Sequence, residues 1–169
     1  FTRELTQKMC ERAPKLSDTI THANSAIAAD AASFVVLVSE LFLKNKMCKG
    51  VEVLGSGTSG VIPEEAPLAP VGAIKALLDK TEISLSHVAF LELMEAYAAQ
   101  AIICTRLCDL DLDKVNIRGG ALSRGHPIGA SGAILVVRLF NELINAPGAS
   151  GVAAIAAAGG IGSAMMLKS

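Results

Sequence analysis

The chain has 169 residues, about the size of one globular domain. It is 51% hydrophobic and only 18% charged, which excludes an intrinsically disordered protein. Its net charge of −1 comes from well-mixed acidic and basic residues, so it lacks the basic stripe that binding to nucleic acid requires. The apolar content is mainly aliphatic, with no tryptophan and a single tyrosine. We therefore expect a closely packed α/β domain.

The sequence does not favour a membrane-spanning protein or a metal-binding protein either. The apolar run Ala31–Leu43 is interrupted by Glu40, and Gly151–Leu167 is mostly Ala and Gly, so neither resembles a membrane span. No signal peptide is visible. The four cysteines have no zinc-site spacing, and Cys104 and Cys108 fit reduced core thiols better than a metal pair. We expect a cytoplasmic protein with no metal site.

The first 45 residues are irregular. A short helix is expected around Glu4–Arg12, ended by Pro14. The segment Ala28–Leu43 has a β-branched centre, which predicts a buried strand that leads into a short helix. The charged connector Lys44–Gly50 suggests a domain boundary, which we place between residues 45 and 46.

After this boundary, strand and helix patterns alternate, which predicts a mostly parallel sheet with helices on both faces. Ser131 is expected to cap the last helix, whose polar stripe includes Arg138 and Glu142. The expected strands lie at 51–53, Val88–Leu93, Val115–Ile117, Val152–Ala158 and Ser163–Leu167, and the expected helices follow Pro70, Glu95 and Ser131.

The glycine-rich run Asn116–Ala133 carries the densest chemical signal. Its His126 lies between Gly125 and Pro127, where no regular element continues, so the loop sets the position of the ring. An imidazole with a pKa near its ordinary value of roughly 6.5 can donate to a carbonyl or accept a thiol proton. The alternative is a loop histidine satisfied by backbone bonds. The neighbouring glycines, which let a ligand approach closely, favour a functional role.

Four blocks of this sequence resemble those of the thiolase family, the coenzyme-A-dependent acetyl transferases. Gly119–Ala133 resembles the Gly-His-Pro signature, Glu92–Gln100 the Asn-Glu-Ala-Phe-Ala block, and Gly151–Gly162 the Cys-x-Gly-Gly-Gly block. Thr21–Ser25 with Asp30–Ala32 resembles the segment before the C-terminal half. The blocks occur in the family's order. Ketosynthases share the fold but normally carry a different histidine pattern.

The resemblance implies the C-terminal half of a thiolase, with a βαβαβαββ domain and a mixed five-stranded sheet at 46–169. Residues 1–45 would be a remnant of the loop region and of the end of the N-terminal half. The implied reaction is ping-pong: an acyl group moves to a cysteine of the missing half, then to coenzyme A or to an acetyl-CoA carbanion. The substrate would be acyl-CoA, and the protein would act in lipid metabolism without a permanently bound cofactor. It would form a homo-oligomer such as a dimer.

The resemblance also implies roles for single residues. His126 would activate the nucleophile and contact the thioester oxygen, Ala158 would offer only its backbone N–H, and Asn24 and Ser25 would contact coenzyme A. Two positions are degenerate. Met94 replaces the family's asparagine, and Ala156 replaces the second cysteine, which removes the α-proton of acetyl-CoA.

Two hypotheses remain open at this point. In the first, the protein is a thiolase-type acyltransferase whose Claisen chemistry is impaired by Met94 and Ala156. In the second, it is a degenerate thiolase-like protein that binds acyl-CoA or a partner without turnover. Under either hypothesis the isolated chain is expected to be inactive, because the nucleophilic cysteine lies in the missing half. Arg118, beside the glycine-rich loop, is expected either to pair with a phosphate or to be solvated.

Overall fold

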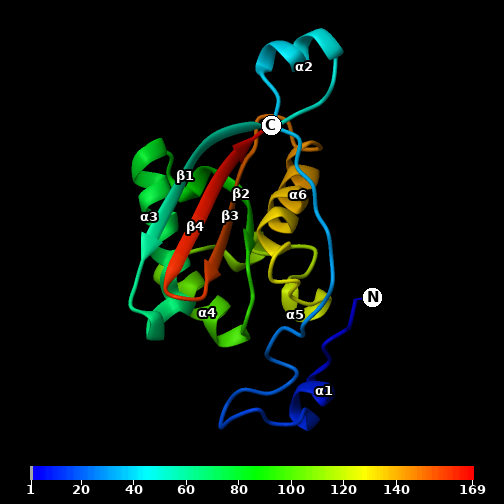
Figure 1. Ribbon diagram of the computed structural model, residues 1–169, viewed down its shortest axis with the longest axis vertical. Helices are drawn as coiled ribbons and strands as arrows, with labels where there is room; N and C mark the ends of the chain where they lie inside the picture. Colours follow the sequence, from blue (N-terminus) through cyan, green and yellow to red (C-terminus); the bar gives the residue numbers. More distant parts are fainter. Residues whose placement is uncertain (1) are drawn as a thin grey trace.

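A computed structural model describes residues 2–169 of the chain. Within these residues one mixed sheet contains four strands in the order β1-β4-β3-β2 (Figure 1). The strands are β1 (Glu52–Gly60), β2 (Val88–Leu93), β3 (Ser150–Ala157) and β4 (Ile161–Lys168). β4 runs antiparallel to both β1 and β3, whereas β2 and β3 are parallel. The prediction of a mostly parallel sheet is therefore wrong, because the hairpin of β3 and β4 and the pairing of β1 with β4 are antiparallel.

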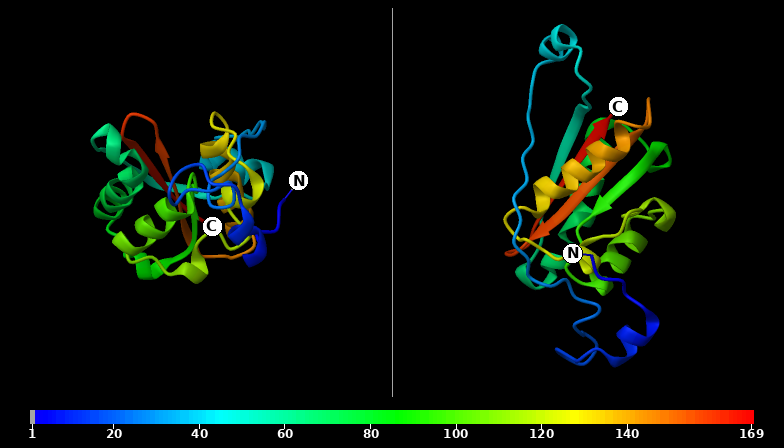
Figure 2. Two further views of the ribbon diagram at one scale, coloured as in Figure 1. Left: turned by 90° about the horizontal axis from the view of Figure 1, so that it is seen from below. Right: turned by 90° about the vertical axis from the view of Figure 1, so that its right-hand side faces the viewer.

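Helices cover both faces of this sheet, as predicted, and Figure 2 shows the sheet between them. α3 (Ala69–Thr81) and α4 (Ala98–Leu107) cover one face, where Ile74 and Leu77 of α3 and Cys104 of α4 pack with Leu91 and Met166. α6 (Ser131–Leu143) packs Leu135, Leu139 and Leu143 on the other face. The remaining helices are α1 (Gln7–Arg12), α2 (Glu40–Lys46), α5 (Ala121–Arg124) and short 3₁₀ helices at Pro63–Leu68, Leu85–His87 and Leu112–Lys114.

Close contact between α3 and the sheet depends on glycine. A Cβ atom added at Gly57 of β1 would lie 2.6 Å from the backbone nitrogen of Leu77, and one added at Gly162 would lie closer than 3.0 Å to the carbonyl of Ala69. The prediction that glycines end the first strand at Gly55 is wrong, because antiparallel pairing with β4 continues to Gly60.

The predicted fifth strand at Val115–Ile117 is also wrong. Only one parallel bridge forms, between Leu91 and Val115, because Asn116 turns into the left-handed region with φ of 49°. The Asn116 side chain then takes the place of a neighbouring strand. Its Oδ1 accepts the amide of Leu93 at 2.9 Å, and its Nδ2 donates to the carbonyl of Leu93 at 2.9 Å.

The predicted buried strand within Ala28–Leu43 is not formed, although the short helix that follows it is present as α2. The segment is exposed, with Phe34 86% and Val36 83% accessible. Apart from a single bridge between Ala28 and His126, it has no strand partner among residues 2–169. An apolar pattern becomes a strand only where a neighbouring strand satisfies its backbone groups. Here the segment runs along the outside of the molecule to α2 (Figure 1).

Candidate active site

His126 is positioned by bonds to both its backbone and its ring. It follows α5 and the buried Gly125, whose φ of 99° favours glycine. The His126 amide donates to the carbonyl of Ile27 at 2.7 Å, and ring Nδ1 lies 2.7 Å from Oγ of Ser131. Burial lowers the pKa of the ring below its ordinary value, which favours the neutral form near neutral pH.

Ser131 therefore has a different role from the one predicted. The N-cap of α6 is Ala130, and Ser131 is the first helical residue. Its hydroxyl lies 3.0 Å from the carbonyl of Pro127, the residue four positions earlier, as well as next to His126. The prediction that Ser131 caps the helix is therefore wrong, because its hydroxyl bonds backward to Pro127 and not to an amide of the first turn.

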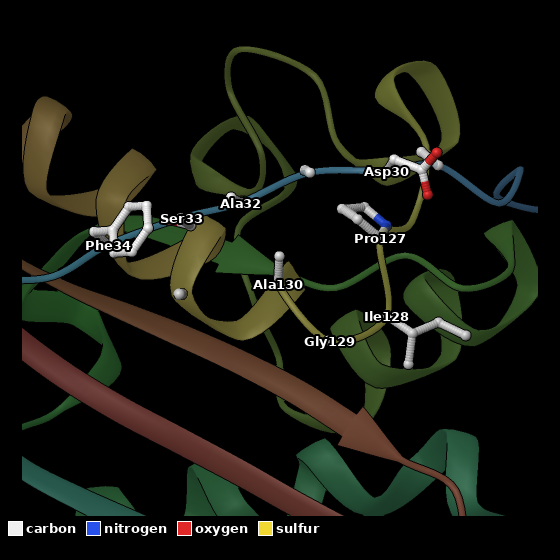
Figure 3. Close-up of a pocket in the computed structure, with 11 residues that line it drawn as sticks. Asp30, Ala32, Ser33, Phe34, Pro127, Ile128, Gly129 and Ala130 are labelled. Carbon is white, nitrogen blue, oxygen red and sulfur yellow. The ribbon is translucent and has the colours of Figure 1, made fainter.

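An open groove of ≈ 520 Å³ adjoins the histidine loop. It lies between the extended segment Ala29–Phe34 and the loop Pro127–Ala130 that leads into α6 (Figure 3). Most of its lining side chains are small, and Asp30 contributes a carboxylate.

A half-buried carboxylate anchors the turn before α5. Glu95 accepts the side-chain amide of Asn116 at 2.5 Å and the backbone amide of Leu122 at 3.1 Å. Its carboxylate fills the space that a Cβ at Gly120 would need, so glycine is required there for packing. Glu95 thus links the segment after β2 to the loop that carries His126.

A buried ion pair, missed by the sequence reasoning, supports the same turn. Glu92 on β2 is 3% exposed and accepts two bonds from Arg138 of α6, at 2.6 and 3.2 Å. Arg138 also donates to the carbonyl of Gly119 at 2.6 Å. Burial raises the pKa of Glu92, against the opposing effect of Arg138. The signal was available, because a glutamate inside the apolar run Val88–Leu93 needs a buried partner.

The polar stripe predicted for α6 is therefore not simply solvent-facing. Besides the pair made by Arg138, Glu142 accepts hydrogen bonds from the guanidinium of Arg118. The Arg118 side chain remains largely exposed, as expected for a solvated residue, and its guanidinium also pairs with Glu142 within the chain.

The degenerate positions lie at the carboxyl ends of β2 and β3, the end at which α6 begins (Figures 1 and 2). Met94 follows β2 and donates its amide to Ala154 at 2.9 Å; its side chain, 4% exposed, belongs to the apolar cluster under α6. Ala156 is half-buried near the end of β3, opposite Gly162. Ala158 is exposed in the turn to β4.

Asn24 and Ser25 lie in a loop against the start of α4. The amide of Ala98 donates to the carbonyl of Asn24 at 2.8 Å. The Asn24 side chain bonds Thr21 and Thr19, and Ser25, 6% exposed, donates to the carbonyl of Thr21 at 2.9 Å. The structure thus places this loop beside the Glu92–Gln100 block, with the polar atoms of both side chains engaged within the loop.

Arg3 fixes this loop to α5. Its guanidinium donates to the carbonyls of Leu122, His22 and Ser25 at 2.7 to 3.0 Å. Segments far apart in the sequence therefore meet around the histidine loop.

Among residues 2–169 no three His, Cys, Asp or Glu side chains are grouped to hold a metal ion. The described residues also include no helix that is both long and apolar enough to cross a bilayer. Cys104 and Cys108 are buried thiols in the core on the α3 face.

A mixed sheet with a Gly-His-Pro loop at the carboxyl end of its parallel strands defines a thiolase-like α/β protein. Residues 48–169 match the family model of the thiolase C-terminal domain. The chain therefore belongs to the thiolase family.

Known relatives are similar over nearly the whole chain. The Bacillus subtilis (strain 168) protein YhfS, which carries the name of an acetyl-CoA C-acetyltransferase, is 40% identical over 90% of this chain and 42% of its own length. The crystal structure of the Bacillus anthracis acetyl-CoA acetyltransferase has a TM-score of 0.91 at 32% identity, covering 96% of this chain and 42% of that one.

Human mitochondrial 3-ketoacyl-CoA thiolase, solved in complex with CoA, has a TM-score of 0.86 at 30% identity, covering 97% of this chain and 42% of that one. The chain thus spans less than half the length of these relatives.

Proposed function

We propose that this chain forms the C-terminal half of a thiolase-family acyl-CoA acyltransferase in which transfer of the acyl group is retained and Claisen condensation is impaired. The observation that carries the proposal is the contrast between a preserved histidine and a missing thiol. His126 is held through Nδ1 and its backbone amide, whereas Ala156, which by the family resemblance stands where the second cysteine would be, carries only a methyl group.

Acyl transfer needs only chemistry that a histidine can support. A thiolate from the N-terminal half attacks the thioester carbonyl, the C–S bond to coenzyme A breaks, and the acyl group remains on the enzyme sulfur. The proton of the attacking thiol passes to His126 and from there to the departing coenzyme A thiolate. No C–H bond is broken, so this step does not require a second thiol.

Condensation needs a group that this chain lacks. An α-proton must leave acetyl-CoA before the carbon can attack the acyl-enzyme, and the methyl group of Ala156 cannot accept it. Met94 cannot hold the water that the family's asparagine fixes, because its side chain is a weak acceptor and is packed into the core. Loss of one such oxyanion donor costs on the order of 100–1,000-fold in rate.

The remaining features of the proposal follow from the family. Residues 1–45 would belong to the loop region and the end of the N-terminal half, and 46–169 would form the C-terminal domain. The backbone N–H of Ala158 would serve an oxyanion hole, and the Asn24–Ser25 loop would lie near coenzyme A, which is a substrate and not a permanent cofactor. The full-length protein would be a cytoplasmic homo-oligomer acting in lipid metabolism.

The alternative is a binding protein without turnover. The burial of Met94 in the apolar cluster under α6 favours it, because an apolar side chain packed there serves packing and not catalysis. The alternative predicts acyl-CoA binding with no transfer of the acyl group.

Two assays on the full-length protein separate these proposals. Exchange of labelled coenzyme A into acetyl-CoA measures acyl transfer, and formation of acetoacetyl-CoA measures condensation. We expect measurable exchange that is lost in His126→Ala, retained in His22→Ala at the exposed histidine, and accompanied by little condensation. Binding without exchange would support the degenerate protein, and condensation at ordinary thiolase turnover would refute the impairment.

Restoration gives a second test. The double variant Ala156→Cys with Met94→Asn should increase condensation, whereas Ala156→Ser with Met94→Asn is the matched control that adds polarity without a thiol. The isolated 169-residue chain should release no stoichiometric burst of coenzyme A from acetyl-CoA.

A further inference from the structure

The neutral imidazole of His126 has two tautomers, and only one of them leaves Nε2 able to accept a proton. If Nδ1 carries the hydrogen, Nε2 has a free lone pair. If Nε2 carries it, the ring can only donate from that side. The function proposed above needs the first tautomer in the resting protein, so what sets the tautomer matters.

Ser131 is placed to set it. Its Oγ is 2.7 Å from Nδ1 and 3.0 Å from the carbonyl of Pro127. The serine is 3% exposed and lies in the first turn of α6, so its side chain is confined and shielded from water.

The hydroxyl of Ser131 can direct its one hydrogen either to Nδ1 or to the carbonyl of Pro127, and its place in the helix favours the carbonyl. A serine hydroxyl has one hydrogen to donate, and a carbonyl can only accept. Serine in a helix commonly donates to the carbonyl four residues earlier, which here is that of Pro127. That carbonyl also accepts the amides of Ala130 and Ser131, at 2.9 Å each, and so marks the start of the helix. With its hydrogen directed there, Oγ presents lone pairs to Nδ1.

We propose that Ser131 is a positioning residue that holds His126 in the Nδ1–H tautomer, with Nε2 unprotonated and free to act as the base. This inference rests on the proposed function only for what Nε2 then does. The tautomer itself is a property of the chain without substrate. The short contact to Nδ1 also limits rotation of the ring, since a flip would bring the ring carbon to the hydroxyl.

Long-range ¹H–¹⁵N spectra of the chain labelled at histidine nitrogen report which ring nitrogen carries the hydrogen. Spectra are recorded at about pH 8, above the ordinary histidine pKa. His126→Gln identifies the His126 signals. We expect the Nδ1–H pattern for His126 in the wild type and in Ser131→Thr, which keeps the hydroxyl. We expect the Nε2–H tautomer, the one preferred by free histidine, to become the major form in Ser131→Ala.

A matched control lies at another serine–histidine contact. Ser86 Oγ is 3.5 Å from Nδ1 of His87 at an exposed site, so Ser86→Ala should leave the His126 signals unchanged. An Nε2–H pattern in the wild type would overturn the proposal, as would an unchanged pattern in a folded Ser131→Ala. If Ser131→Ala does not fold, the tautomer observed in the wild type and in Ser131→Thr still tests the proposal. Coenzyme A exchange is measured separately, so either proposal can fail without the other.

Discussion

Replacement of Gly57 by alanine should destabilise the protein far more than the same replacement at Gly60, in the same strand. At Gly57 the new Cβ would lie 2.6 Å from the Leu77 nitrogen and 3.0 Å from its Cα, whereas ordinary contacts begin near 3.4 Å. These are backbone atoms of α3 and cannot rotate aside, so the helix must move by about 1 Å. At Gly60 nothing lies within 4 Å of the new Cβ.

Overpacking of this kind costs about 1–3 kcal/mol, and we expect the upper end because α3 is also held against β4 at Gly162. For a domain of this size, about 3 kcal/mol corresponds to a melting temperature lower by about 6–12 °C. Gly60→Ala should stay within about 0.5 kcal/mol of the wild type. Urea denaturation followed by circular dichroism measures both variants. Equal stability of the two would refute the close helix–sheet approach.

Three further outcomes are expected. Arg138→Met should lower the free energy of unfolding, measured by urea denaturation, by about 3–5 kcal/mol, because it leaves the buried Glu92 carboxylate without a partner. Adding Glu92→Leu should recover most of this loss. No recovery would contradict the assignment of the loss to an unpaired charge. Burial lowers the pKa of His126, so the unfolded chain binds the proton of this ring more readily, and the stability of the protein should fall as pH decreases below the ordinary histidine pKa of 6.5. His126→Gln should reduce this decline between about pH 7 and about pH 5. An equal decline in wild type and variant would contradict the lowered pKa. Burial raises the pKa of Cys108 to about 11, so iodoacetamide should label exposed Cys10 in the native protein and leave Cys108 unmodified until urea is added, as mass spectrometry of the peptides can check.

Local patterns were sufficient for much of the fold. The strand Val88–Leu93 is confirmed at both ends, because a short apolar run bounded by turns has few other solutions. The helix at Pro70 and the helix that begins at Ser131 are also confirmed, because their apolar residues recur at helical spacing. The family resemblance, carried by the loop around His126, is confirmed by the match to the thiolase C-terminal domain.

The wrong or missing predictions involve residues whose partners a local pattern does not identify. Ala28–Leu43 has the composition of a buried strand but finds no sheet to join. At Val115 the extended run ends after one residue, because Asn116 adopts a positive φ and uses its side chain in place of backbone. The pair of Glu92 with Arg138 joins residues 46 positions apart, a separation at which periodicity carries no information.

The amide of Asn116 has one more consequence, for association between molecules. An exposed strand edge offers unpaired N–H and C=O groups to any other chain, and so invites aggregation. On β2 this edge is occupied: Asn116 takes both backbone groups of Leu93 and the carbonyl of Leu91, and the ammonium of Lys114 takes the carbonyl of Val88 at 3.1 Å. A polar turn thus closes the sheet on the β2 side and blocks the addition of another strand there.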